Sequence, residues 1–513
     1  MTQTCGAAEK ASRMTARNAV AVVLEDVPVL EPDAFGADCL EVCGEGGRVA
    51  ALCALAPGGS GPPDAREVLA VLPLDSSGTL ALSRMRLPAT RRYPALSTAL
   101  PQAQAFEREL LEDHGIQPEG HPWPKPLRRH SDLEAASGEA AGSARYPFFR
   151  VEGSGIHEVA VGPVHAGIIE PGHFRFQCHG ESVLHLEIQL GYQRRGVEAL
   201  LTRCPPSWRL ALAESIAGDT AIGHALAYVC AVEALSGVEV PLAAQAMRGI
   251  ALELERVANH VGDLGALCND VGYLPGASWF GRLRGEFLNL LLDLSGNRFG
   301  RGLLRPGGVR FGLSSRQRAD FLARLRAAEL DLTDTADLTF GAPSVCSRFE
   351  ETGILGREVA DELGLVGPAA RASGCDRDAR RDHPAGIYRF AHIPVSLADS
   401  GDVIARALVR WLETQRSMTF LTEEIAELPE GNLSMELPPL RSGRVAVSLV
   451  EGWRGEIAHM AVTSGDGRLT AYKVVDPSFH NWFGLSVAMR DNGISDFPLC
   501  NKSFNLSYAG HDL

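Results

Sequence analysis

Hydrophobic and polar residues are patterned in several ways along this chain, and the first pattern predicts a small domain of mixed strands and helices. Residues 19–100 hold short apolar runs separated by turn residues, among them AVAVVLE, RVAALCALA and EVLAVLPL. Apolar runs of this length, bounded by turn residues, are typical of strands. The charged stretch FERELLEDHGI (106–116) predicts a short helix and is followed by a proline-rich extended segment.

A second pattern, with a period near 3.6 residues, covers residues 208 to 300. Two Ala- and Leu-rich stretches carry it, WRLALAESIAGDTAIGHALAYVCAVEAL and PLAAQAMRGIALELERVANHVGDLGALCNDV. Both are too apolar for surface helices, so they predict a buried helical bundle. Further helices are predicted at 315–335, 355–363 and 400–426.

A third pattern, alternation with a period of two, predicts strands before the helices. It occurs in PFFRVEGSG (147–155) and HFRFQCHGESVLHLEIQLG (173–191). Strands are predicted again from residue 443, in RVAVSLVEG, EIAHMAVTS and LTAYKVVD. No internal repeat is evident. The fold class predicted by these patterns is α+β.

Composition shifts predict the domain boundaries. Residues 1–18 are small and polar, which predicts a disordered tail, and SDLEAASGEAAGSAR (131–145) is typical of a linker. The predicted organisation is a first domain at 19–128, a linker at 129–147 and a second domain at 148–513.

The charge balance argues against nucleic acid as a partner. The formal net charge is −14, from 49 Lys and Arg against 63 Asp and Glu. Arginines cluster in RRGVE (194–198) and DRDARRD (376–382), either as solvated helix faces and loops or as ion pairs at a subunit interface. No signal peptide and no apolar run long enough for a membrane span is evident. Any membrane role is therefore expected to come through partner subunits.

The cysteines do not predict a metal site or a disulfide framework. There are 11, with no CxxC pair, and Cys39 and Cys43 are spaced i, i+4 without a second pair. Most are expected to be small buried hydrophobic residues. The chain also lacks a glycine-rich nucleotide-binding fingerprint.

Several polar residues stand out within apolar surroundings. Arg256, Asn259 and His260 share one face of a predicted helix, which fits a structural buried network and also fits binding of water or a partner. His165 and His173 flank a Pro-Gly loop, where a histidine either reaches a ligand or caps the turn.

Long motifs give the chain a strong family resemblance. They are GPVHAGIIEPGHFRF (162–176), GESVLHLEIQLGYQRRGVE (180–198), HALAYVCAVEAL (224–235), LELERVANHVGDLGALCNDVGY (252–273), SGNRFGRGLLRPGGVR (295–310) and RASGCDRDARRD (371–382). Together they resemble the large subunit shared by group 4 membrane-bound nickel–iron hydrogenases, including formate hydrogenlyase, and by the quinone-site subunit of respiratory complex I. The likeness covers about residues 150–513.

The first domain carries a resemblance of its own. YPALSTALPQAQAFERELLEDHGIQPEGHP (93–122) resembles the neighbouring accessory subunit of complex I, which formate hydrogenlyase-type large subunits carry fused in front. The resemblance implies an N-terminal α/β accessory domain. A hydrogenase-large-subunit-like fold would follow it, with small β-sheets around a buried helical bundle.

The resemblance also shows what this chain lacks. The four cysteines that hold nickel and iron in the hydrogenases fall on Ala217, Thr220, Ser507 and Gly510. Thiolate softness is what selects such metals, so the chain is expected to bind no metal and a working nickel–iron hydrogenase is disfavoured. The cysteine nearest in sequence to the second pair, Cys500, cannot replace four thiolates.

The complex I likeness is partial at the quinone site. The histidine and tyrosine that hold the quinone head there fall on Ile168 and Gly218, while an earlier loop histidine matches His165. Quinone binding therefore stays open, in a cavity lined differently.

Two further residues, Glu198 and His224, are expected at the same cavity and are candidates for a proton relay. Glu198 matches the glutamate that hydrogenases place beside the metal to move protons. The alternative is a structural carboxylate paired with Arg194 or Arg195. His224 is expected to face the same cavity as Thr220. The alternative is a buried core histidine whose ring nitrogens are both hydrogen-bonded.

The function implied is a metal-free large subunit of a complex I-like or formate hydrogenlyase-like membrane oxidoreductase. It would dock an Fe–S small subunit and membrane-embedded antiporter-like subunits, at the cytoplasmic face of the inner membrane, and couple electron transfer to the membrane arm. Fe–S clusters are expected in the partner, not in this chain. NADH, ferredoxin and formate remain open as electron sources. The alternative is a non-catalytic scaffold retained for assembly.

Overall fold

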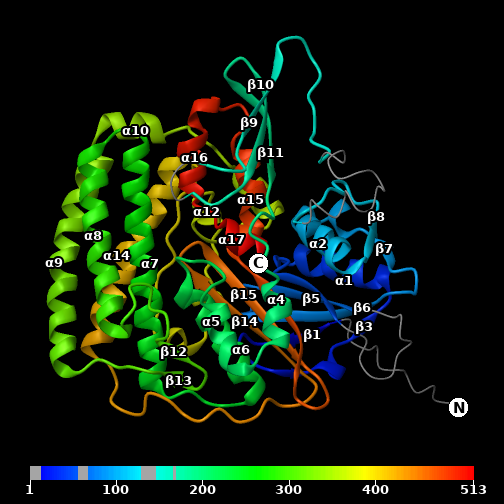
Figure 1. Cartoon of the computed structure of the whole chain (residues 1–513), viewed down its shortest axis with the longest axis horizontal. Helices are drawn as coiled ribbons and strands as arrows, with labels where there is room; N and C mark the ends of the chain where they lie inside the picture. Colours follow the sequence, from blue (N-terminus) through cyan, green and yellow to red (C-terminus); the bar gives the residue numbers. More distant parts are fainter. Residues whose placement is uncertain (1–12, 56–66, 129–145, 166–168) are drawn as a thin grey trace, which may run out of the picture.

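The computed structural model describes residues 13–55, 67–128, 146–165 and 169–513. Long helices stand together on one side, a smaller part with its own sheet lies on the other, and a second sheet runs between them (Figure 1). The predicted linker 129–147 lies almost wholly outside the described residues, as do most of the predicted tail and Ile168.

The N-terminal part is built on a five-stranded sheet. Its strands follow the order β1-β6-β5-β4, with β3 pairing with β6 in parallel. Helix α1 packs against β5 and β6, and α2 packs against β4. The elements of this part are β1 (Met14–Ala16), η1 (Leu24–Asp26), β3 (Val29–Leu30), α1 (Pro32–Gly44), β4 (Ala51–Leu55), β5 (Glu67–Leu74), β6 (Thr79–Arg86), β7 (Arg92–Pro94), η2 (Leu96–Thr98), η3 (Pro101–Ala103), α2 (Gln104–His114) and β8 (Gln117–Glu119).

A four-stranded sheet lies at the centre and joins the two parts. Strands β14 (Arg444–Gly452), β15 (Gly455–Thr463) and β16 (Leu469–Val475) pair antiparallel, and β2 (Val22–Val23) adds to the edge at β14. Helix α6 (Ala221–Ser236) covers β14 and β15. Nearly every residue of α6 is buried, as its apolar character all round requires.

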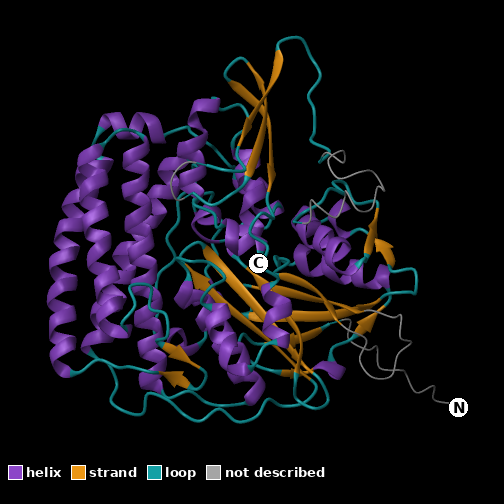
Figure 2. Ribbon diagram, in the orientation of Figure 1, coloured by secondary structure: helices purple, strands orange, loops and turns teal. Residues whose placement is uncertain are grey.

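Four long helices form a bundle, which Figure 2 shows as the purple block beside the central sheet. Of the two stretches predicted to form it, 241–271 supplies one of these helices, whereas 208–235 supplies α6, which packs on the central sheet instead. The four helices are α7 (Leu242–Asp270), α8 (Leu274–Ser295), α9 (Ser315–Phe340) and α14 (Val403–Ala426), and α7 packs against both α8 and α14. A capping box between Ser314 and Gln317 starts α9. The helices predicted at 315–335 and 400–426 correspond to α9 and α14.

Short elements complete the second part. A three-stranded sheet, β11-β10-β9, extends from the body beside α15, as Figure 1 shows at the top. The remaining elements are β9 (Ile156–Val161), β10 (His173–His179), β11 (Ser182–Gln189), α4 (Val197–Arg203), α5 (Pro206–Ala213), β12 (Leu304–Arg305), β13 (Gly308–Val309), α10 (Pro343–Phe349), α11 (Arg357–Glu362), α12 (Gly367–Arg371), α13 (Ala379–Asp382), η4 (Gly386–Arg389), α15 (Pro477–Ala488), η5 (Ile494–Asp496), α16 (Phe497–Phe504) and α17 (Tyr508–Asp512).

Two predictions were wrong, the extent of the disordered tail and the strand at 147–155. The tail predicted to reach residue 18 already pairs with β6 through β1, and Asn18 is buried with hydrogen bonds to the carbonyls of His383 and Leu449. The segment 147–155 is no strand, because the amides of Phe149 and Val151 donate to the side chains of Glu187 and Gln177 rather than to a neighbouring strand.

None of the helices in the described part of the chain combines the length and the apolar character needed to cross a bilayer.

Candidate functional site

The two segments that resemble the metal-holding segments of the hydrogenases meet in this chain. Residues 214–224 and 503–513 are joined by two arginines from elsewhere in the sequence. Arg195 donates hydrogen bonds to the carbonyl of Ile216 at 2.8 Å and to that of Ala509 at 3.3 Å. Arg454, in the turn between β14 and β15, bonds to Asp219 in the first segment and to the carbonyl of Asn505 in the second. The two segments therefore lie side by side.

An ion pair lies between these segments. Arg454 contacts Asp219 in a bidentate arrangement, with nitrogen–oxygen distances of 2.6 and 2.8 Å. Its guanidinium also stacks 3.9 Å above the Trp453 ring. Burial raises the pKa of Asp219, but the charge of Arg454 and its hydrogen bonds more than offset this, so the pKa is lowered and the carboxylate is ionised.

The four positions that match metal ligands are all occupied by structural contacts. Ala217 is fully buried, and the Thr220 hydroxyl accepts hydrogen bonds from Trp453 and Arg454. The Ser507 hydroxyl accepts from the amide of Gly510 at 2.9 Å and thereby caps α17. A Cβ atom added at Gly510 would come within 2.6 Å of the Asp476 carboxylate.

This donor set does not fit a nickel–iron centre. Two of the four positions carry no polar side-chain atom, and the hydroxyl groups of the other two are engaged in hydrogen bonds. Alcohol oxygens are also poor ligands for metals that thiolates select. Across the residues that the structure describes, no three His, Cys, Asp or Glu side chains are arranged to hold a metal ion.

His224 begins a chain of buried hydrogen bonds beside the two segments. One ring nitrogen lies 3.0 Å from Asp476 and the other lies 3.1 Å from His459, which in turn contacts the Tyr472 hydroxyl at 2.8 Å. Burial and the neighbouring His224 lower the pKa of His459, so this ring is neutral. For Asp476, burial raises the pKa and the hydrogen bond from His224 lowers it, with a net decrease. His224 itself is fully buried with both ring nitrogens engaged.

Helix α7 fixes the turn that carries Arg454. Arg256 donates to the carbonyls of Glu451 and Gly452, the last residues of β14, and Asn259 donates to the carbonyl of Asp219 at 3.0 Å. His260, on the same helix face, lies 2.8 Å from Glu413. Burial lowers the pKa of His260 to about 4, so it stays neutral near pH 7.

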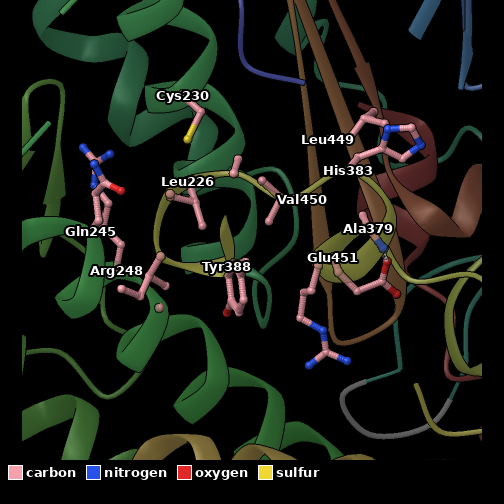
Figure 3. A pocket seen from close by; sticks show the side chains of 15 residues that line it. Leu226, Cys230, Gln245, Arg248, Ala379, His383, Tyr388, Leu449, Val450 and Glu451 are labelled. Carbon is pink, nitrogen blue, oxygen red and sulfur yellow. Dashed lines mark hydrogen bonds between the residues drawn. The ribbon is translucent and has the colours of Figure 1, made fainter. Parts of the chain in front are cut away.

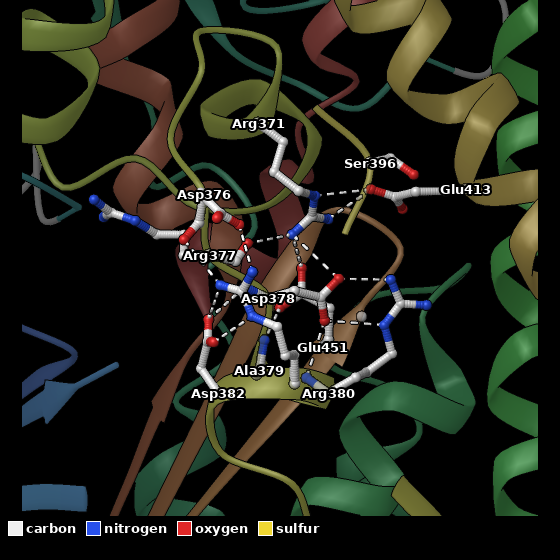
Figure 4. Close-up of polar contacts among 12 residues, drawn as sticks. Arg371, Asp376, Arg377, Asp378, Ala379, Arg380, Asp382, Ser396, Glu413 and Glu451 are labelled. Atoms are coloured by element: carbon white, nitrogen blue, oxygen red, sulfur yellow. Dashed lines mark hydrogen bonds and ion pairs between the residues drawn. The ribbon is translucent and has the colours of Figure 1, made fainter. Parts of the chain in front are cut away.

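A buried network of opposite charges extends from this helix, and Figure 4 shows its centre. Arg371 lies between Glu413 and Glu451, 2.8 Å from each. Asp378 and Arg380 pair at 2.6 Å, and both are at most 5% exposed. The arginines of 376–382 were predicted to lie on solvated surfaces or at a subunit interface. For Arg380 that is wrong, because its partners are within this chain.

Glu198 does not pair with either adjacent arginine. Its carboxylate lies 3.0 Å from the ammonium of Lys473 and accepts from the amide of Val474 at 2.9 Å. Lys473 also pairs with Glu109 from the N-terminal part, at 2.6 Å. Burial raises the pKa of Glu198, the repulsion of Glu109 adds to this, and Lys473 opposes it, with a net increase. Glu198 and Lys473 line a cleft between the two parts of the molecule.

The sequence left open that Glu198 is a structural carboxylate paired with Arg194 or Arg195, and this prediction is wrong for both arginines. Arg194 pairs with Asp113 at 2.8 Å, and Arg195 donates to backbone carbonyls.

The loop that matches the complex I quinone loop packs on the second segment. His165 and His173 contact the carbonyls of Gly172 and Gly162, at 2.9 and 3.1 Å, across the loop. Glu170 accepts from the amide of Tyr508 at 3.2 Å. Ile168 lies outside the described residues, and a Cβ added at Gly218 would meet no atom within 4 Å.

Inspection of the sequence missed the residues that organise this site. Arg454, Asp476 and His459 come from the C-terminal strands and the turns beside them, far from the segments that they contact. Asp219 lies inside a segment that was singled out, but its position next to the expected cysteines gave no sign of an arginine partner. An arginine next to the glycine that begins the following strand, as in WRGE (453–456), is the local signal that was available.

Comparison with known proteins places this architecture among redox enzyme subunits. The family described as the respiratory-chain NADH dehydrogenase 49 kDa subunit matches residues 270–442. The chain is 30% identical over 440 residues to hydrogenase-4 component G of Escherichia coli K12, in an alignment that covers 82% of this chain and 76% of that protein.

Two further relatives represent the two branches of the resemblance. Formate hydrogenlyase subunit 5 of Escherichia coli K12 is 30% identical over 436 residues, covering 82% of this chain and 77% of its own. A subunit of the NADH-quinone oxidoreductase of Dehalococcoides mccartyi is 32% identical over 340 residues, covering 63% of this chain and 89% of its own. The resemblance expected from the motifs is thereby confirmed.

Proposed function

Because this chain belongs to the family of group 4 hydrogenase-type large subunits that is related to complex I, we propose that it serves a complex I-like or formate hydrogenlyase-like membrane complex without a metal of its own. The observation that carries the proposal is the Arg454–Asp219 ion pair between two segments that have no thiol at the four ligand positions. The guanidinium and the carboxylate are paired with each other, and neither supplies the thiolate that selects nickel.

In this proposal the chain docks an Fe–S small subunit and contributes a preformed polar site to electron transfer, with quinone as the acceptor class. The chain His224–His459–Tyr472 is a connected set of groups that can hold or pass a proton next to the segments. Asp476 is ionised, so its carboxylate accepts the hydrogen bond that joins it to His224. The membrane arm is reached through partner subunits.

A non-catalytic scaffold is the second candidate, and the residues at Gly218 and Gly510 favour it. Neither offers a side-chain group to a quinone or a metal, and the polar residues between the segments are already paired with one another. In this case the fold serves assembly, and redox chemistry is absent from the subunit.

The native assembly distinguishes the two candidates. It is isolated from its host, reduced through a low-potential viologen and mixed with a soluble quinone analogue. The rate of quinone reduction is measured, and the rate in the absence of protein is subtracted. Electron transfer by the assembly supports the proposal, and His224→Gln is expected to slow it while leaving the subunit composition unchanged. His157→Gln, on an exposed strand position, is the matched control. An intact assembly with Fe–S clusters that does not reduce the quinone identifies the scaffold.

A further inference from the structure

An arginine-rich segment lies beside the first of the two segments described above. Residues 298–310, RFGRGLLRPGGVR, carry four arginines and no acidic residue, in a chain whose formal net charge is −14. Within them, β12 and β13 pair as a short hairpin, which Figure 1 shows near the bottom of the view. Arg301 donates to the carbonyl of Gly218 at 3.4 Å, and the amide of Gly302 donates to Glu214 at 2.7 Å. These contacts join the arginine-rich segment to that first segment.

The arginines of this segment have no acidic partner within the part of the chain that the structure describes. All of them are exposed, and none forms an ion pair there: Arg298, Arg301, Arg305 and Arg310. Arg298 and Arg301 lie over the ring of Phe299, 4.7 and 5.9 Å from its centroid. Arg301 and Arg310 both act on Glu214, where burial raises the pKa and the two charges oppose the increase. The unpaired charges therefore gather on one part of the surface.

The backbone that carries Arg305 is fixed to the body of the protein. The amide of Val309 donates to the carbonyl of Leu433 at 2.8 Å, and a Cβ added at Gly308 would lie 2.1 Å from the same carbonyl oxygen. Arg248 of α7, labelled in Figure 3, donates to the carbonyl of Arg305 at 2.9 Å. A contact surface with a fixed backbone loses little conformational freedom on binding, so it is prepared for a partner.

The chemistry of the segment favours a protein partner that carries carboxylates. A guanidinium group donates two parallel hydrogen bonds to a carboxylate, and arginine and aromatic residues are enriched where proteins meet. Phe311, which follows Arg310, is 48% exposed. An anionic membrane fits less well, because its charge repels a chain of net charge −14 as a whole. A protein partner has to match the charge of the contact alone.

We infer that residues 298–311 form a docking surface for an acidic face of another protein subunit. Carboxylates of that subunit pair with Arg305 and Arg310, and the contact extends past Arg301 toward the first segment. The inference rests on the function proposed above, because it needs an assembly that contains a second chain. It adds the place of the contact and the charge of the partner.

The test joins lysines to carboxylates in the native assembly with a zero-length coupling reagent, which links only groups in contact. Arg305→Lys and Arg310→Lys keep the positive charge and supply the amine that the reagent needs. Mass spectrometry of peptides is expected to find links from the introduced lysines to Asp or Glu of another subunit. The Lys502–Asp270 ion pair within this chain is the positive control for coupling. Arg326→Lys, at an exposed position on α9, is the matched control and is expected to give no such links.

Charge reversal gives a second measurement. Arg305→Glu combined with Arg310→Glu is expected to lower about tenfold the amount of this chain that is retained in the assembly, because like charges would then meet. Arg326→Glu should leave that amount unchanged. Thermal melting checks that each variant is folded, and the lysine variants carry the test if the charge reversal does not fold.

Three results would overturn the inference. One is an assembly that reduces quinone but gives no links from the introduced lysines to another subunit, which leaves the proposed function standing. Another is an equal yield of links at Arg326→Lys. The third comes from flotation of the full chain with vesicles of phosphatidylglycerol or of phosphatidylcholine. Binding to the anionic vesicles alone, abolished by the charge reversal, would identify a lipid surface in place of a protein.

Discussion

Replacing Arg454 by methionine is expected to loosen two distant segments of the chain at the same time. The guanidinium bonds to Asp219 in the first segment and to the carbonyl of Asn505 in the second. Methionine keeps much of the apolar stem that lies against Trp453 but carries no donor. Residues 214–224 and 503–513 should therefore both open more readily.

The magnitude follows from the exposure of the two partners. The side chain of Arg454 is 4% exposed and that of Asp219 is 34% exposed. Breaking a fully buried pair costs about 3–5 kcal/mol. Water can reach the carboxylate left behind, so we discount this to about 2 kcal/mol for local opening. That free energy corresponds to amide hydrogen exchange about 30-fold faster in both segments.

Hydrogen exchange followed by mass spectrometry of peptides measures this directly. Arg468→Met is the matched control, because Arg468 is 86% exposed and pairs only with the exposed Asp466. Its exchange in the two segments should equal that of the wild type. Faster exchange in only one segment, or in neither, would refute the idea that Arg454 holds them together.

Three further predictions concern the surroundings of this pair. Gly510→Ala should lower the melting temperature, because the added Cβ would lie 2.6 Å from the Asp476 carboxylate. Gly218→Ala should leave the melting temperature nearly unchanged, because no atom lies within 4 Å of its Cβ. Equal effects of the two substitutions would contradict this packing. Lys473→Met should lower the free energy of unfolding by about 3 kcal/mol at pH 7, as measured by denaturant titration, because Glu198 loses its ammonium partner. This loss of stability should become smaller toward pH 4, because carboxylates become protonated there. The pKa of His260 in the folded chain, about 4, lies below its ordinary value of 6.5. The contribution of His260 to stability is therefore complete above pH 6.5 and is lost between pH 6.5 and pH 4. Over that pH window the melting temperature of His260→Gln should fall less steeply than that of the wild type.

Elements with strong periodicity could be predicted from the sequence, and elements that depend on distant partners could not. Helices α9 and α14 repeat apolar positions over many residues, and β14 to β16 hold apolar runs of strand length, so local pattern suffices. β1 is only three residues long and exists because it pairs with β6, which no local pattern indicates. In 147–155 the alternation was present, but glycines at 153 and 155 adopt positive φ angles and the backbone bonds to side chains instead.

The candidate site shows the same division. The resemblance located the four ligand positions within two segments that do meet in space. The polar groups that now fill the site could not be found this way, because Arg454 and Asp219 are separated by 235 residues. Pairing of charges over such distances depends on how the central sheet approaches α7, and a single sequence carries no signal of it.

Nickel content is the most direct test of the central claim, that paired polar groups have replaced a thiolate-held metal between these segments. The native assembly is isolated under reducing conditions, and nickel is measured by plasma mass spectrometry against the amount of this chain. The account predicts iron from the clusters of partner subunits and nickel no higher than in a mock purification. Nickel near one atom per chain, lost when Thr220 or Ser507 is replaced by alanine, would contradict it.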